Sequence, residues 1–253
     1  MTDPLTMTTL LWLSGAAGLA GFIDAIAGGG GLLTLPALLL AGLPPTAALA
    51  TNKGQSVWGS AAALIRFSRS NLLDRQRLPH AFFWGLVGAV AGTLLLQAIP
   101  AQALRPVVVV LLFVAAIAVL VIRIPDETAA RSRGAFLTGL VAGGIGAYDG
   151  FFGPGTGTFL ILAFVLLWHE PFHVASANAK VVNCASNVGS LSVFAILGQV
   201  WWLPAICMGL AQIIGGWLGA HVVVRSGQRY VRGLAVVMSL AIVARLAWQM
   251  MND

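Results

Sequence analysis

The chain has 253 residues, of which 58% are hydrophobic and only 9% are charged. A soluble domain carries about 25% charged residues, so this composition excludes an ordinary soluble protein and indicates an integral membrane protein. The net charge of +6 fits a surplus of Lys and Arg in cytoplasmic loops better than it fits binding to nucleic acid. Apolar runs recur along the whole length, so we expect an all-α, polytopic bundle with no soluble domain.

The apolar segments follow one another at helical length. The segments 31–43 and 157–168 are too short to span a bilayer, because a membrane helix needs about 20 residues. We expect these two to be half-helices or return arms of hairpins, and whether they cross the membrane is left open. In chain order the segments are 9–27, 31–43, 46–66, 79–98, 103–123, 134–150, 157–168, 173–197, 202–224 and 230–250.

The first half of the chain recurs in the second half. The stretch GFIDAIAGGGG, which contains Asp24, aligns with GAYDGFFGPGT, which contains Asp149. Further on, ALATNKGQSVWGS aligns with ASANAKVVNCASN and places Lys53 over Lys180. Each half therefore has about five helical elements, with a broken or short helix after its glycine-rich run.

The two halves of the chain are residues 1–123 and 134–253. Where a loop of one half is rich in Lys and Arg, the equivalent loop of the other half is poor in them. The loop 66–77 has four arginines, whereas its counterpart 198–204 has no charged residue. Because Lys and Arg gather in cytoplasmic loops, the sequence predicts two inverted repeats within one membrane domain. The linker 124–133 is then cytoplasmic, and both termini lie outside. Inverted repeats with interrupted helices are typical of secondary transporters.

The only lysines of the chain, Lys53 and Lys180, both lie within apolar segments. An ionisable side chain at a helix centre costs at least about 2.5–3.5 kcal/mol. Neutral polar residues share the helix face of each lysine or lie close to it in the sequence, and two cations among such groups suit an anion. The expected substrate-binding residues beside the lysines are Asn52, Gln55, Ser56, Ser60, Asn178, Asn183 and Asn187.

Two other interpretations of the lysines stay open. Either lysine can extend to the membrane interface, which is a real option for Lys53 near the start of its helix. Both can also form structural ion pairs with Asp24 and Asp149. A carboxylate that holds a lysine until substrate or a proton displaces it would combine the structural and the functional role.

Two glycine runs, GGGG at 28–31 and GPGTG at 153–157, interrupt the apolar segments. Such runs release the backbone from the helix, and Pro154 strengthens the second break. The half-helix beyond each break begins with N–H groups that attract an anion. Close packing through small residues is the alternative, but four consecutive glycines fit a break better. The anion-binding residues expected at the breaks are Gly29, Gly30, Gly31, Thr34, Gly155, Thr156, Gly157 and Thr158.

The stretch from His169 to His173 has the letters of HExxH, the zinc metalloprotease motif. That chemistry needs both histidines on one continuous helix. Pro171 disfavours helix at Glu170 and fits the start of a new helix, so we expect a loop here.

The residues that carry the strongest motif pattern are GFIDAIAGGGGLLTLPALLLAGLPPTAALATNK and its echo GxxDGFFGPGTG, followed by NAK and NxxSN. This combination resembles the TauE/SafE sulfite-exporter family, also called the toluenesulfonate uptake permease family, over nearly the whole chain. The resemblance implies transport of sulfite, sulfonates or related organic anions, and a location in the bacterial inner membrane with periplasmic termini.

The sequence thus predicts a secondary transporter of a small anion that works by alternating access, and not an enzyme. Asp24 and Asp149 are the expected coupling or gating residues, because protonation of a buried carboxylate would release a lysine. Asp24 either moves a proton or holds Lys53. Proton or sodium coupling, a homodimer, the direction of transport and the exact substrate stay open. The alternative functions are an anion channel and, against the loop expected at His169 to His173, an intramembrane zinc metalloprotease. The expected partners are the anion and the lipid bilayer, without a cofactor, a metal or nucleic acid.

Overall fold

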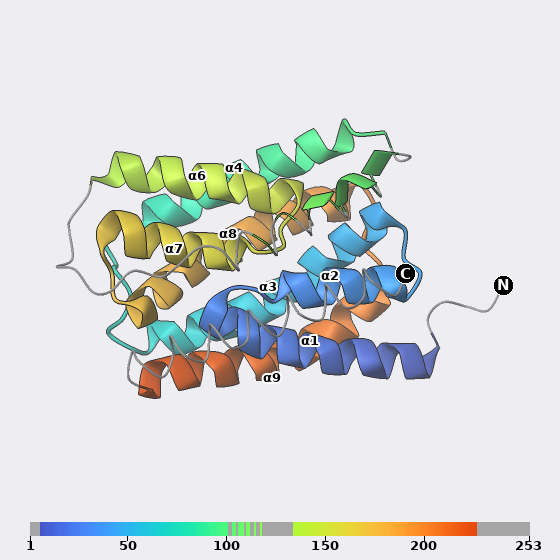
Figure 1. The fold of residues 1–253 in the computed structure, drawn as a ribbon, viewed down its shortest axis with the longest axis horizontal. Helices are drawn as coiled ribbons and strands as arrows, with labels where there is room; N and C mark the ends of the chain where they lie inside the picture. The colour runs from blue at the N-terminus through green and yellow to red at the C-terminus, as the bar shows by residue number, and fades with distance from the viewer. Residues whose placement is uncertain are drawn as a thin grey trace.

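The computed structural model describes residues 6–100, scattered positions between 103 and 117, and residues 134–226. The expected segment 230–250, the linker 124–133 and most of 103–123 lie outside these residues. Within the described part, the regular elements are all α-helices, as the composition predicts (Figure 1). They are α1 (Met7–Ala27), α2 (Gly31–Leu40), α3 (Pro45–Ser68), α4 (Leu78–Gln97), α6 (Ala135–Phe151), α7 (Thr156–Trp168), α8 (Phe172–Ile196) and α9 (Trp202–Arg225).

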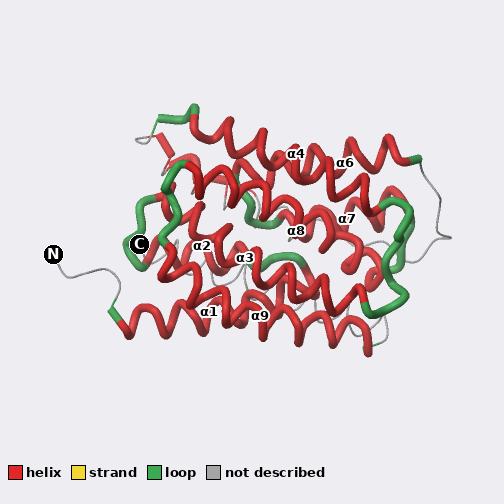
Figure 2. The backbone as a smooth tube through the Cα atoms, turned by 180° about the vertical axis from the view of Figure 1, so that it is seen from behind, coloured by secondary structure: helices red, strands yellow, loops and turns green. Residues whose placement is uncertain are grey.

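The two expected helix breaks are confirmed. Helix α1 ends at Ala27 because Gly28 adopts a φ of 78°, which an L side chain rarely adopts. In the second half, α6 ends at Phe151, and Gly153 and Gly155 adopt φ values of 101° and 86° before α7 begins. The short helices α2 and α7 have 10 and 13 residues, too few to span a bilayer alone. In Figure 2 the breaks are short loops in the middle of the bundle, whereas the other loops lie at its two ends.

The two halves interlock. Helix α1 packs along α9 and α4 packs along α6, while α3 lies against α9 and α4 against α8. Each of these contacts joins a helix of the first half to one of the second. They rest on close backbone approach: a Cβ on Gly92 would lie 1.9 Å from the Ala147 carbonyl oxygen, and one on Gly215 the same distance from the Gly18 carbonyl oxygen.

The equivalent helices α3 and α8 run in opposite directions (Figure 1). Near the start of α3, Thr51 Oγ1 accepts a hydrogen bond from the N–H of Trp201, directly after α8 has ended. Near the start of α8, Asn178 Oδ1 accepts one from the N–H of Asp74, in the loop after α3. The start of each helix therefore lies beside the end of the other.

The surface of the bundle is apolar. Of the described helices, α1, α4, α8 and α9 are long and apolar enough to cross a membrane. Large side chains such as Phe136, Ile196 and Ile214 are 84%, 85% and 65% exposed, whereas the lysines and many amides are buried. An exposed apolar surface of this kind fits contact with lipid.

Candidate functional site

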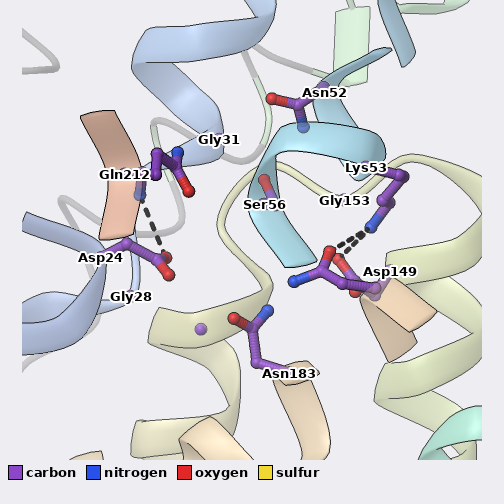
Figure 3. Close-up of a pocket in the computed structure, with 13 residues that line it drawn as sticks. Asp24, Gly28, Gly31, Asn52, Lys53, Ser56, Asp149, Gly153, Asn183 and Gln212 are labelled. Atoms are coloured by element: carbon purple, nitrogen blue, oxygen red, sulfur yellow. Dashed lines mark hydrogen bonds and ion pairs between the residues drawn. The ribbon is translucent and has the colours of Figure 1, made fainter. Parts of the chain in front are cut away.

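A small polar pocket lies where the two helix breaks meet (Figure 3). Its free volume of about 20 Å³ is room for roughly one water molecule. The walls come from both halves and combine glycine backbone with charged and amide side chains. They are formed by Asp24, Gly28, Gly30, Gly31, Asn52, Lys53, Ser56, Asp149, Gly153, Gly157, Asn183, Asn187 and Gln212.

Two ion pairs cross between the halves at this pocket. Lys53 Nζ lies 2.7 Å from Asp149 Oδ1, and Lys180 Nζ lies 2.7 Å from Asp24 Oδ2. Each lysine is only 2% exposed, so neither extends to the membrane interface. The expectation that Asp24 holds Lys53 is wrong: Asp24 pairs with the lysine of the other half. The same holds in the other direction, because Asp149 of the second half pairs with Lys53 of the first half.

The two carboxylates differ in their surroundings. The Asp149 side chain is 2% exposed, and its second oxygen accepts a hydrogen bond from the Ser186 hydroxyl. The Asp24 side chain is 22% exposed, and its second oxygen accepts the N–H of Gly30 at 3.3 Å, immediately before α2. Lys180 also donates to the Asp24 carbonyl oxygen at 2.8 Å. Both carboxylates line the pocket, but Asp149 is almost fully buried, whereas the Asp24 side chain is partly exposed.

The two breaks touch each other through their backbones. A Cβ on Gly28 would lie 2.0 Å from the carbonyl carbon of Gly157. Beside this contact, the Thr158 hydroxyl donates to the Ala27 carbonyl oxygen at 2.8 Å. The end of α1 is thus fixed against the start of α7.

Neutral amides complete the pocket. Asn52 Oδ1 accepts bonds from Thr34 Oγ1 at 2.5 Å and Gln55 Nε2 at 2.9 Å, which leaves its amide N–H groups for the pocket. Asn183 points toward the space between Asp24 and Asp149 (Figure 3). Within the described part of the chain, no donor reaches Asn183 Oδ1. The pocket therefore has amide groups available for a ligand.

Most of the expected site residues lie at this pocket or directly behind it. Lys180 lies behind Asp24, Gln55 and Thr34 lie behind Asn52, and Ser60 donates to the Ser56 carbonyl oxygen. The Thr156 hydroxyl is bound to the Gly153 carbonyl oxygen, as Thr158 is to that of Ala27, so the threonines support the breaks. The expected residues Gly29, Gly155 and Asn178 do not line the pocket. The expected residues that do line the pocket are Asp24, Gly30, Gly31, Asn52, Lys53, Ser56, Asp149, Gly157, Asn183 and Asn187.

Three lining residues are missing from the expected site. Gly28 and Gly153 belong to the glycine runs and line the pocket through their backbone. Gln212 comes from α9, where it is a buried polar residue in an apolar helix. A glutamine within an apolar segment could have marked Gln212 as a candidate site residue. The aligned residue of the first half is Gly88, so the internal repeat gave no second polar residue to support it.

An ionic end cluster, formed by Asp74, Arg77, Glu170 and Asn178, joins the halves at one end of the bundle. Arg77 forms ion pairs with Asp74 and Glu170, and Asn178 Nδ2 donates to Glu170 Oε2 at 2.9 Å. Burial raises the pKa of Asp74, but the hydrogen bond and charge of Arg77 outweigh it and lower that pKa overall. The cluster ties the loop after α3 to the loop before α8.

The stretch from His169 to His173, which has the HExxH pattern, includes Glu170 of the ionic end cluster. His169 adopts a φ of 55° and terminates α7, and α8 begins only at Phe172. Glu170 is bound to Arg77. The expected loop is confirmed, and the two histidines do not share a helix. Among the described residues, no three His, Cys, Asp or Glu side chains come together as a metal site.

The opposite end of the bundle is held by neutral groups. The amides of Gln97 and Gln199 bind each other through two hydrogen bonds of 2.8 and 3.2 Å. Thr51 binds the N–H of Trp201 at the same end. Thr51 stands two residues before Lys53, as Asn178 stands two residues before Lys180. Equivalent positions of the two halves thus form hydrogen bonds with the other half at the two ends.

Comparison with known proteins identifies the family. The model of the family described as "Sulfite exporter TauE/SafE" matches residues 13–246. The chain belongs to the TauE/SafE sulfite exporter family. No solved structure matches it significantly.

Relatives from several organisms match nearly the full length of the chain. The "Probable membrane transporter protein YfcA" of Escherichia coli (strain K12) is 40% identical over 252 residues, 98% of this chain and 92% of the relative. A "Probable membrane transporter protein" of Haemophilus influenzae is 38% identical over 231 residues, 90% of this chain and 91% of the relative. "Probable membrane transporter protein ORF9" of Sinorhizobium sp is 38% identical over 247 residues, 96% and 94% of the two chains. With the apolar helices, these names indicate a membrane transporter rather than an enzyme.

Proposed function

We propose that this membrane transporter carries a small sulfur-containing anion, sulfite or an organosulfonate, through the polar pocket. The observation that supports this most is the reciprocal exchange of Lys53–Asp149 and Lys180–Asp24 between the halves. Buried charges in a membrane bundle are costly and are usually functional. The family name gives the substrate class, and the lysines and amides give the matching chemistry.

The charges of the pocket favour coupling to protons. Two lysines and two carboxylates neutralise one another, so an added anion would meet no net positive charge. Protonation of one carboxylate leaves one lysine without its partner and creates a site for a monoanion. A proton entering with the anion therefore keeps the occupied pocket neutral. Sodium coupling stays the alternative.

Alternating access is the mechanism that the architecture supports. The opposed directions of α3 and α8 fit an inverted repeat, and such repeats exchange conformations to open one side at a time. Contacts between the halves bridge both ends of the bundle, and the pocket has room for roughly one water molecule. An anion would therefore enter only after the contacts at one end separate. We place the arginine-rich loop 66–77 in the cytoplasm and the protein in the inner membrane.

Transport by purified protein in proteoliposomes tests this function. Lys53→Ala and Lys180→Ala should each reduce uptake of labelled sulfite or methanesulfonate by roughly ten- to a hundredfold, because a hydrogen bond to a charged group contributes about 1.5–3 kcal/mol. Ser192→Ala, at an exposed position of α8, should transport like the wild type. Wild-type activity in both lysine variants would refute the site.

The same vesicles separate a transporter from an anion channel. Saturable uptake and counterflow of labelled anion are expected of an alternating-access transporter. Flux that neither saturates nor shows counterflow would support the channel.

A further inference from the structure

The Asp24 carboxylate occupies the place of an anion at the start of α2. One oxygen accepts the N–H of Gly30 and the other lies 2.7 Å from Lys180 Nζ. A Cβ on Gly30 would lie 2.7 Å from Asp24 Cβ, so the carboxylate side chain packs directly on the glycine backbone. A helix N-terminus beside a lysine attracts an anion, and here the protein supplies that anion from its own chain.

Accessibility separates Asp24 from Asp149. Asp24 is 22% exposed and lines the pocket, whereas Lys180 behind it does not line the pocket. Asp149 is 2% exposed, with one oxygen on Lys53 and the other on Ser186. Both carboxylates line the pocket, as Lys53 does, but Lys180 becomes accessible to a solute there only when the Asp24 carboxylate moves.

Asn183 provides an observation that does not depend on the helix end. Its side chain is nine-tenths buried, points into the pocket, and has an oxygen without a donor among the described residues (Figure 3). An unsatisfied buried amide costs about 1–3 kcal/mol. An amide can donate to an anion or accept from a protonated carboxyl, so Asn183 matches both species that replacement of the Asp24 carboxylate would create.

We propose that the anionic group of the substrate displaces the Asp24 carboxylate from Lys180 and the N–H of Gly30, and that Asp24 takes up one proton from water as it leaves. The inference rests on the proposed anion transport and deepens it. Lys180 keeps its proton, Asp24 becomes neutral, and the substrate carries the negative charge that Asp24 carried. One proton therefore enters with each monoanion, and a sulfonate or hydrogensulfite group, with oxygens for several donors, fits this subsite.

Few other charges face Asp24. Helix α8 contributes Lys180, and the pocket also contains Lys53 from α3 and Asp149 from α6, which neutralise each other. Helices α2 and α7 and the rest of α1 contain no ionisable residue, and α9 contributes the neutral Gln212 to the pocket. Protonation of Asp24 is thus the simplest change that leaves Lys180 free for an anion.

Binding of methanesulfonate to the purified full-length protein, measured by calorimetry between about pH 5 and pH 8, tests the proposal. This probe stays monoanionic, so any pH dependence belongs to the protein. If Asp24 is ionised in the free protein and takes up one proton when the anion binds, the Kd should rise about tenfold for each unit by which the pH rises. Asp24→Asn should bind with a Kd independent of pH, whereas the matched variant Asp74→Asn, in which the exchanged carboxylate lies outside the pocket, should keep the wild-type dependence.

The other outcomes overturn the proposal in distinguishable ways. An unchanged pH dependence in Asp24→Asn, or its loss in Asp74→Asn, rejects the assignment to Asp24 and leaves the anion site of the proposed function in place. No binding of methanesulfonate, sulfite or acetate to the wild type rejects both. If Asp24→Asn does not fold, proton uptake by the wild type in weakly buffered solution decides: about one proton per bound anion supports the proposal, and none overturns it.

Discussion

The enclosed ion pair should stabilise the protein more than the accessible one. Lys53→Met leaves the Asp149 carboxylate 2% exposed without its cation. Removing one partner of a buried pair costs about 3–5 kcal/mol, because the remaining charge has neither a partner nor water. Lys180→Met leaves Asp24 22% exposed and still bound to the N–H of Gly30, so we expect a cost of about 1–3 kcal/mol.

Thermal unfolding in detergent measures both costs. In a Cys207→Ser background, which removes the partly exposed thiol, a thiol-reactive dye reports unfolding through Cys184, which is buried in the folded protein. At about 2–4 °C per kcal/mol, Lys53→Met should lower the Tm by about 6–20 °C. Adding Asp149→Asn should restore much of this loss, because the amide is neutral and still accepts the Ser186 hydroxyl. Equal losses in the two lysine variants, or no recovery in the double variant, would refute the reasoning.

Two further predictions concern the breaks and the ionic end cluster. Gly28→Ala should abolish transport, because its Cβ would lie 2.0 Å from a backbone carbon, whereas Gly144→Ala has nothing within 4 Å and should be active in the same proteoliposome assay. Arg77→Gln should cost about 1–3 kcal/mol by leaving the buried Glu170 carboxylate without its cation. Arg77 also holds the pKa of Asp74 below its ordinary value of 3.8, so that contribution is present above about pH 4 and is lost as the pH falls through the lowered value. The Tm difference between wild type and Arg77→Gln should therefore shrink below about pH 4, and a constant difference would contradict the assignment.

The charged residues that meet at the pocket were predictable because isolated charges in apolar segments are conspicuous. Lys53, Lys180, Asp24 and Asp149 each stand out, and the internal repeat relates lysine to lysine and aspartate to aspartate. The pairing was not predictable, because it depends on how helices distant in the sequence pack. Sequence spacing shows which residues share one helix face, and it contains no information on which half supplies the partner.

At the helix breaks, too, the sequence predicted the backbone conformation but not the contacts of the side chains. The glycine runs correctly predicted where α1 and α6 end, since positive φ values require glycine there. The hydroxyls of Thr34 and Thr158 also suggested ligand groups, but each donates to a neighbouring oxygen. A hydroxyl is assigned to a ligand or to the fold only by the distance to its nearest acceptor, and that distance is a tertiary property.

The contact between Gly28 and Gly157 has a mechanical consequence. Backbone atoms form it, so no change of rotamer can lengthen it. If the halves move as the proposed alternating access requires, this contact favours rocking about the point over sliding apart. Helix α3 has 24 residues and is about 36 Å long, so a rotation of roughly 10° about its middle moves either end by about 3 Å. A displacement of that size separates the hydrogen bonds at one end of the bundle and compresses those at the other. The glycine contact would then act as a pivot that prevents both ends from opening together.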